Sequence, residues 1–249
     1  MDRWACVNFP ELPLQLLQRH HPEWRGQPVV VVDHDKPNGV IQWSNEAARA
    51  YRILPGMRFA TGLSLCSELR AGVVNQTLTD QAIEEVTREL RCFSPSVEPA
   101  AGEPGVFWLD ASGLRHLYPS LDHWAETLQR QVRRSLELYS LLTVGFTRFG
   151  TYALARSMRV TQRNSRFHRV LPSARDELKE AARVPLDRLS LPPKLRDALF
   201  KLGIRTVGDF VKLPPGGLKE RFGSEAFALH KRMAGLSWQP LQGHAPEDP

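Results

Sequence analysis

Two spacings of hydrophobic residues alternate along the first 160 positions, one typical of strands and one typical of helices. Short runs of apolar and β-branched residues predict buried strands at 4–9, 28–32, 40–43, 96–99, 105–110 and 141–146. Apolar residues three or four positions apart predict helices at 12–20, 45–51, 62–69, 79–91, 121–138 and 151–157. This mixed order is typical of an α+β domain and not of a doubly wound sheet.

The helix over 79–91 has the clearest pattern. Thr79 is expected to cap it, and its acidic residues come early while its arginines come late, which matches the helix macrodipole. Ala82, Val86 and Leu90 form one apolar stripe. We therefore expect this helix to lie on the surface with the stripe against the core.

Beyond residue 175 the pattern is helical only. Glycine and proline divide it into predicted short helices at 186–189, 193–202, 207–213, 218–222 and 224–234. A small all-helical domain follows from this. The last ten residues, PLQGHAPEDP, are polar and rich in proline, and we expect them to link to a further region.

Composition excludes several classes of protein. Hydrophobic residues make up 42% and charged residues 24%, as in an ordinary globular protein. No apolar run approaches the ~18 residues of a membrane span, and the first residues do not resemble a signal peptide. We therefore expect a cytoplasmic protein. The net charge of +6 and the pI of about 9.5 favour an anionic partner, with nucleic acid the first candidate.

Cysteine and histidine give no sign of a metal site or a disulfide framework. Cys6, Cys66 and Cys92 are odd in number and far apart. The only histidine cluster is His20 and His21, and adjacent helical residues point in different directions. We expect no metal ligands of this kind and no cofactor.

An arginine-rich stretch separates the mixed part of the chain from the helical part. Residues 156–169 contain no acid and five arginines, which are Arg156, Arg159, Arg163, Arg166 and Arg169. Such a run suits a phosphate backbone, and it equally suits a solvated linker.

Two further motifs carry weaker signals. Residues 199–210, LFKLGIRTVGDF, are similar to half of a helix–hairpin–helix, with Thr206 as a cap for the second helix. Asp110 ends the predicted strand in GVFWLDAS, and a role in the following turn is its simplest explanation.

Taken in order, these segments resemble a Y-family translesion DNA polymerase over residues 3–235. The resemblance rests on the series PEWRGQP, GVIQWSNEAAR, LPGMR, FWLDAS, VGFTRFGTYALAR and LFKLGIRTVGDF. Within that family, FWLDASGL, YPSL and VGFTRFGTYALAR look most like the ImuB-type accessory proteins of bacteria. The resemblance implies a palm of 1–10 and 75–165, fingers of 11–74, a thumb of 166–240 with a degenerate helix–hairpin–helix, and a linker of 241–249. The family's little-finger domain would lie beyond this chain.

The family's metal-binding carboxylates have no counterpart here. Matching its motifs places them at Asn8, Pro10, Gly105 and Val106, none of which is an acid. Because magnesium needs anionic oxygen ligands, the resemblance implies a chain that has lost catalysis. We therefore expect a protein that is not an enzyme.

Other active-site positions of the family also differ. The sugar-selecting aromatic falls at Pro13, and the triphosphate-binding pair falls at Glu46 and Arg49. The two palm lysines fall at Gly150 and Leu154. The phosphate-binding hairpin of the thumb falls near 191–193, where two prolines lack the N–H group that it uses.

The function implied is that of a DNA-associated scaffold for translesion synthesis and damage-induced mutagenesis. The resemblance implies DNA, a sliding clamp, a RecA-like small accessory protein and an error-prone C-family DNA polymerase as partners, in the bacterial nucleoid. The basic residues expected to contact DNA are Arg148, Arg156, Arg159, Arg163, Lys194, Arg196, Lys201 and Arg205.

Two alternatives stay open. One is an active translesion polymerase with displaced metal ligands, for which Glu11, Glu103 and Asp110 are the nearby acids. The other is an unrelated basic α+β protein with a DNA-binding helical domain.

Overall fold

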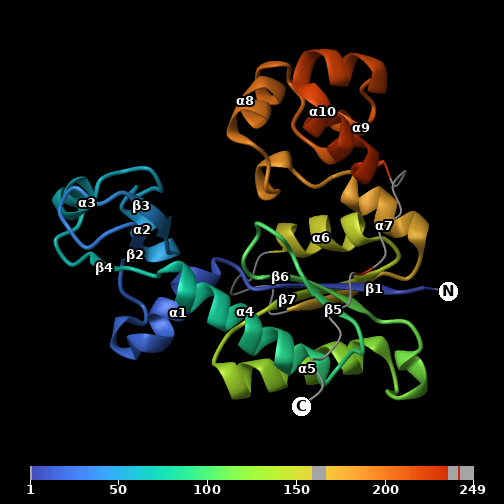
Figure 1. Cartoon of the computed structure of the whole chain (residues 1–249), viewed down its shortest axis with the longest axis horizontal. Coiled ribbons are helices and arrows are strands. Elements are labelled where there is room, and N and C mark those ends of the chain that lie inside the picture. Colours follow the sequence, from blue (N-terminus) through green and yellow to red (C-terminus); the bar gives the residue numbers. More distant parts are fainter. Residues whose placement is uncertain (1, 159–166, 235–240, 242–249) are drawn as a thin grey trace.

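The computed structural model describes residues 2–158, 167–234 and 241, which form three units (Figure 1). A five-stranded sheet with helices on both faces forms the largest unit, and a three-stranded sheet with its own helices forms the second. The third unit is helical. The expected mixed α+β fold is confirmed. Within the described residues no helix is long and apolar enough to cross a membrane.

The large sheet is built around β1 (Trp4–Asn8), which is antiparallel to both of its neighbours. The strands run in the order β5 (Val97–Pro99), β6 (Val106–Asp110), β1, β7 (Leu141–Gly145) and β8 (His168–Val170). At the edges, β5 pairs antiparallel with β6, and β8 pairs parallel with β7.

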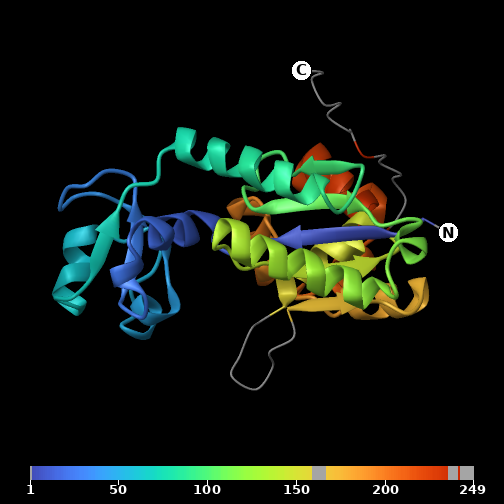
Figure 2. The same ribbon diagram turned by 90° about the horizontal axis from the view of Figure 1, so that it is seen from below.

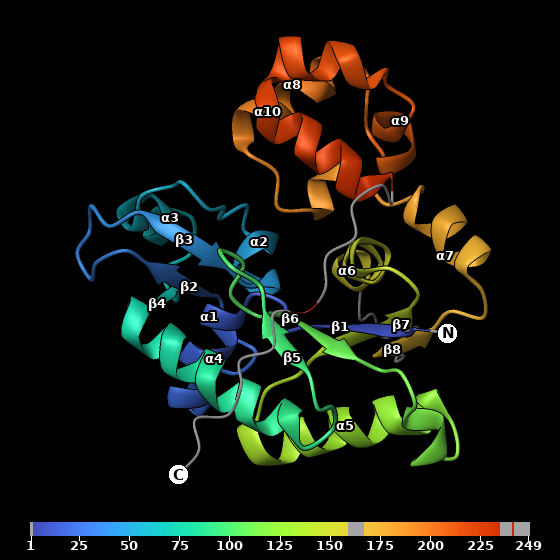
Figure 3. The same ribbon diagram turned by 45° about the vertical axis from the view of Figure 1, so that its right-hand side comes forward.

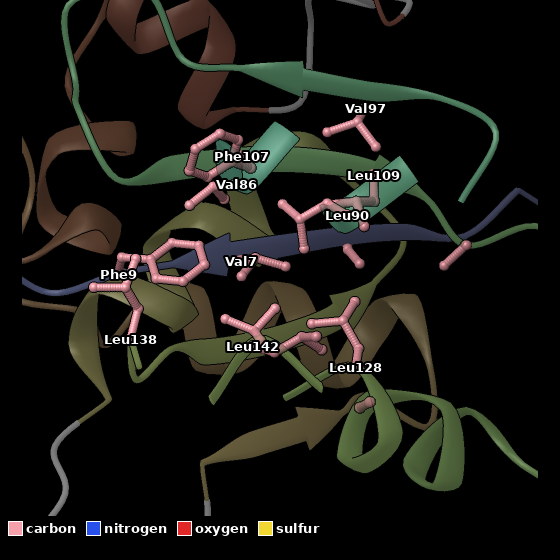
Figure 4. Packing of buried hydrophobic residues seen from close by; sticks show 14 of the residues in the cluster. Val7, Phe9, Val86, Leu90, Val97, Phe107, Leu109, Leu128, Leu138 and Leu142 are labelled. Carbon is pink, nitrogen blue, oxygen red and sulfur yellow. The ribbon is translucent and has the colours of Figure 1, made fainter. Parts of the chain in front are cut away.

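Helices cover both faces of this sheet. α4 (Gln76–Arg91) and α5 (Leu121–Leu136) lie on one face, and α6 (Arg148–Ser157) lies on the other (Figures 1 and 2). Because successive strand residues point to opposite faces, Val7 packs into the core with α4 and α5 (Figure 4), whereas Cys6 belongs to the cluster with α6. Asn8 is two residues from Cys6 and therefore faces the α6 side.

The small sheet has the order β3 (Ile41–Ser44), β2 (Val29–Val32) and β4 (Arg70–Gly72). Two of the four valines of β2 pack with α1 (Leu12–His20), and the other two pack with the cluster that includes Ala48 and Leu63. Both faces of β2 are therefore buried, which explains a strand without polar residues. α2 (Glu46–Ala50) and α3 (Phe59–Leu65) complete this unit, and a 3-10 helix (Pro22–Trp24) follows α1.

The helical unit packs on α6 through one shared cluster of buried side chains (Figure 3). Gly223 has φ of 85° and interrupts the last helix at the place where the sequence predicts a division. The elements are α7 (Ala174–Ala181), a 3-10 helix (Leu186–Arg188), α8 (Pro193–Lys201), α9 (Val207–Val211) and α10 (Pro215–Met233). A further 3-10 helix (Leu114–His116) precedes α5 in the large unit.

Two sequence predictions need correction. The helix expected at 62–69 is α3 and begins at Phe59, because N–H groups of its first turn donate to the carbonyls of Gly39 and Pro37. The helix expected to start at Thr79 begins three residues earlier, with Asn75 as its cap. Residues 168–170, which no predicted element includes, form β8 of the large sheet.

Candidate functional site

A cleft of about 570 Å³ lies where the two sheets and the helical unit meet. Its walls come from the end of β1, from α1, from the junction of β3 with α2, from α6 and from the 3-10 helix before α8. The described charged residues that line it are Glu11, Glu46, Arg49, Arg156, Asp187 and Arg188. Three are acidic and three are basic, so this cleft carries both signs of charge.

Asn8 lies in the wall of this cleft. It ends β1, is only 3% exposed, and pairs across the sheet with Val106 on one side and Leu141 on the other. Its Oδ1 atom is buried and has no hydrogen-bond partner among the described residues. A buried polar atom without a partner costs stability, so a bound group that donates to Asn8 would recover that cost.

Gly105 has a backbone role that its replacement by an acid would disturb. The backbone N–H of Phe9 donates to the Gly105 carbonyl at 2.7 Å, which ties the turn before β6 to the chain after β1. Gly105 has φ of 96°, and a Cβ atom there would lie 2.7 Å from the Phe9 carbonyl oxygen. Pro10, the other family position on this segment, accepts a hydrogen bond from the Gln15 amide at 2.9 Å.

These residues do not fit a pair of divalent cations. Hard cations need anionic oxygen ligands, and the four positions that the family uses carry an amide, a proline ring, a glycine and an isopropyl group. The described residues also contain no group of three or more His, Cys, Asp or Glu side chains placed to hold a metal. No metal-dependent step follows from these four positions.

Arg49 is engaged by Glu11. The guanidinium forms an ion pair with the Glu11 carboxylate, which crosses from the start of α1 to α2. Burial raises the pKa of Glu11, although the Arg49 charge pulls that pKa in the opposite direction. Of the two positions expected to bind triphosphate, Arg49 is therefore held by Glu11. The other, Glu46, is an exposed acid that lines the same cleft.

Arg148 lies inside the large unit and not on a free surface. Its side chain is 13% exposed, forms a bidentate pair with Glu98 at 2.6 and 3.1 Å, and stacks over the Trp108 ring at 4.4 Å. These contacts favour a structural role in place of the predicted DNA contact.

Packing leaves no room for lysine side chains at Gly150 and Leu154, the two positions where the family has lysine. A Cβ atom at Gly150 would overlap the carboxylate of Glu177, which reaches over from α7. That carboxylate accepts hydrogen bonds from the backbone N–H groups of Phe146 and Thr147 and from the Thr147 hydroxyl. Leu154 is 3% exposed in the cluster shared with the helical unit. Glycine and leucine at these two positions therefore serve the contact between α6 and the helical unit.

The remaining predicted DNA contacts are spread over two units. Arg156 lines the cleft, and its Nε donates to the Arg188 carbonyl at 3.2 Å. Arg159 and Arg163 lie outside the described residues. Four exposed residues belong to the helical unit, and they are Lys194, Arg196, Lys201 and Arg205. Of these, Arg196 pairs with Asp197 at 3.3 Å, and Arg205 lies 5.7 Å from the Phe200 ring centre.

Three weaker sequence signals also have a place in the structure. Asp110 lies at the opposite end of β6 from Val106 and accepts from the Ser112 N–H at 2.8 Å, which is the expected turn role. Thr206 caps α9 in a capping box with Asp209, as predicted. At 191–193, Pro192 and Pro193 begin α8 and offer no N–H group.

Sequence reasoning missed two groups of contacts. Glu177 belongs to none of the motifs recognised in the sequence, yet it is 2% exposed and holds the start of α6. Tyr152 donates from its hydroxyl to Glu103 at 2.8 Å and accepts from the Ser190 N–H at 3.1 Å. For Glu177 the usable signal was the pair Gly145 and Gly150, because glycines on both sides of a cap indicate a close approach.

Comparison with known proteins identifies the family. The model of the impB/mucB/samB family matches residues 7–151, which is more than half of the chain. The DNA polymerase IV of Moorella thermoacetica is 29% identical over 230 residues, covering 90% of this chain and 55% of that protein. The DNA polymerase IV of Halorhodospira halophila is 26% identical over 229 residues, covering 90% of this chain and 61% of that protein. The chain thus spans little more than half the length of these relatives.

Solved structures share the fold. DinB from Sulfolobus solfataricus superimposes with a TM-score of 0.77 at 14% identity, covering 97% of this chain and 69% of that one. An insertion ternary complex of Dbh DNA polymerase gives 0.73 at 15% identity, covering 96% and 69%. This agreement also excludes an unrelated basic α+β fold.

These relatives correct one expectation. The absence of the family's carboxylates at four positions predicted a protein that is not an enzyme, and the name DNA polymerase IV carried by the relatives contradicts that prediction. The match of the family model across both sheets agrees with the polymerase-like arrangement of the three units. The chain belongs to the impB/mucB/samB family, within the Y-family DNA polymerase superfamily.

Proposed function

We propose that this chain is the DNA-binding core of a translesion DNA polymerase. In this proposal the cleft between the two sheets and the helical unit receives primer–template DNA. The large sheet unit, residues 1–10 and 75–165 with β8, is the palm, residues 11–74 are the fingers, and the helical unit up to residue 240 is the thumb. The observation that carries the proposal is the cleft itself, which residues of all three units line. The family membership supports it.

Synthesis by this core would use a carboxylate displaced from the family's positions. Glu11 follows Pro10 directly and lines the cleft. The relatives named DNA polymerase IV support this reading over a chain without activity.

The exposed cations of the helical unit are the proposed phosphate contacts. Lys194 and Lys201 form no ion pair with any described residue, and both project from α8. Arg196 and Arg205 are exposed on the same unit. Lysine and arginine on phosphate give binding that is independent of sequence and falls with salt.

Two measurements on the purified chain test the proposal. Fluorescence anisotropy with a labelled primer–template reports binding, and primer extension with dNTPs and Mg²⁺ reports synthesis. We expect both, with extension lost in Glu11→Gln while binding stays equal or becomes stronger, because one negative charge leaves the cleft. The control is Glu84→Gln on the exposed side of α4. Binding without extension by the wild type would reject the synthesis proposal alone, and absence of binding would reject both.

A finer proposal concerns partners. The segments that resemble ImuB-type accessory proteins suggest a sliding clamp, a RecA-like small accessory protein and an error-prone C-family DNA polymerase. One faint clamp-like segment, residues 15–17, is buried in α1 and is therefore a poor site for that contact. Co-elution of the chain with each purified partner in gel filtration tests the proposal, and separate elution in all three cases would reject it.

A further inference from the structure

One face of α6 contacts the backbone that leads into α8. Tyr152 and Arg156 are four residues apart and so lie on the same side of the helix. The Tyr152 hydroxyl accepts from the Ser190 N–H at 3.1 Å, and Arg156 Nε donates to the Arg188 carbonyl at 3.2 Å. Both bonds end on the main chain of 188–190, which joins the 3-10 helix to α8. We call these two bonds the 188–190 contact.

Glu103 fixes the direction of the tyrosine hydroxyl. Its carboxylate oxygens lie 2.8 and 3.0 Å from the Tyr152 oxygen, so the phenol proton is donated to Glu103 and an oxygen lone pair remains for Ser190. Burial and the Glu103 charge raise the pKa of Tyr152, so the phenol keeps its proton. The Tyr152 hydroxyl thus links the β5–β6 turn, α6 and the segment that leads into α8.

Tyr152 cannot easily move away from this place. It is 7% exposed, and its ring packs near the rings of Trp108 and Phe149, at 6.1 and 6.2 Å between centres. The two hydrogen bonds reach backbone atoms of the partner segment, and the buried side chains of Leu189 and Leu191 pack into the cluster shared with α6. The helical unit therefore has a fixed anchor on the sheet unit beside the cleft.

We propose that Tyr152 and Arg156 are positioning residues that hold the helical unit at the angle at which the cleft binds primer–template DNA. Arg156 then acts through the Arg188 carbonyl and not as a phosphate contact. This inference rests on the proposed DNA binding.

Loss of a phosphate contact and loss of a positioning bond change the salt dependence of DNA binding in different ways. The slope of log K against log salt is negative, and a lost phosphate contact makes it less negative by about 0.9. A lost positioning bond lowers the fraction of molecules with the correct angle, and the apparent affinity falls by that fraction while the bound complex keeps its phosphate contacts. The slope then stays unchanged.

The test compares Tyr152→Phe, Arg156→Gln and Lys194→Gln in primer–template titrations at several salt concentrations. We expect Tyr152→Phe and Arg156→Gln to weaken binding three- to thirtyfold with the slope of the wild type, and Lys194→Gln to make the slope less negative. A less negative slope in Arg156→Gln would overturn its positioning role. Wild-type affinity in Tyr152→Phe would overturn the role of the tyrosine.

A second measurement does not need DNA. Spin labels on Cys92, which is exposed, and on Glu220→Cys in α10 report the distance between the sheet unit and the helical unit, since Cys6 and Cys66 are buried. We expect Tyr152→Phe to broaden that distance distribution. Glu103→Gln, which keeps an acceptor at the same place, should broaden it less. An unchanged distribution in Tyr152→Phe would overturn the inference even if wild-type DNA binding failed.

Discussion

At the residue scale, Gly105 shows how the backbone limits what this site can contain. Its φ of 96° disfavours any L side chain, and its missing Cβ leaves room for the Phe9 carbonyl. We predict that Gly105→Ala lowers the free energy of unfolding by about 2–4 kcal/mol, because a strained φ of about 1–3 kcal/mol is joined by a steric overlap. Urea unfolding measures this change.

Gly102 is the matched control for that prediction. It lies three residues earlier with φ of 76°, and nothing lies within 4 Å of its added Cβ. Gly102→Ala should therefore cost only the conformational part, about 1–2 kcal/mol. Equal losses in the two variants would show that the Phe9 carbonyl does not limit position 105.

Glu177 is a carboxylate whose burial matters more than its hydrogen bonds. Burial raises its pKa in the folded protein, and the bonds from Thr147 and Phe146 lower that pKa by less. Between the ordinary carboxyl pKa of about 4.3 and the raised value, the folded state binds more protons than the unfolded state. Its contribution to stability is therefore complete below the ordinary pKa and is lost as the pH rises through the raised one.

Comparison with Glu177→Gln isolates this effect. We expect the free energy of unfolding of the wild type, minus that of Glu177→Gln, to fall as the pH rises through that window and then to level off. Urea unfolding at a series of pH values between 4 and 8 measures the difference. A difference that grows with pH would mean that the hydrogen bonds outweigh burial.

At the element scale, Gly223 divides what would otherwise be one long helix. Its φ of 85° and ψ of 175° belong to a region that only glycine occupies readily, and open space surrounds its Cβ position. We predict that Gly223→Ala destabilises the chain by about 1–3 kcal/mol and favours a continuous helix. Gly217→Ala, in the same helix with open space, should stabilise by up to about 1 kcal/mol. Thermal unfolding of both variants checks the opposite signs.

The sequence predicted most elements because their apolar spacing is strong and local. β4 and β8 were missed because each has three residues and is defined by parallel pairing with a distant strand. The true start of α3 was missed for a similar reason. In α3 the first N–H groups are satisfied by a loop twenty residues earlier, which no local pattern reveals.

The site was predictable only as far as side-chain identity decides it. The absence of acids at Asn8 and Gly105 can be read from the motifs, and so can the arginine at position 49. The ion-pair partners of the arginines cannot be predicted from the motifs. Glu11 and Arg49, like Glu98 and Arg148, are far apart in the sequence and meet only in the folded chain. Arg49 and Arg148 are thus held by acids, and Arg156 is bonded to a backbone carbonyl.

At the scale of the whole molecule, these ion pairs leave the exposed cations expected to bind DNA, among the described residues, mainly on the helical unit. The cleft has three acids and three bases in its described lining, so its own field favours neither sign strongly. α8 instead presents Lys194 and Lys201, seven residues apart and so on one side of the helix. Electrostatic attraction to phosphate should therefore come mainly from the helical unit.

This distribution predicts the salt dependence of DNA binding. The double variant Lys194→Gln, Lys201→Gln should bind every primer–template sequence more weakly, and the negative slope of log K against log salt should become less negative by about 0.9 for each lysine. The matched control removes two exposed cations of α7 and its end, Lys179→Gln with Arg183→Gln, which line a separate groove. Anisotropy titrations at four salt concentrations give both slopes. Because the two double variants lose the same net charge, a general effect of charge would change both slopes equally, and that result would remove α8 from the DNA-binding surface.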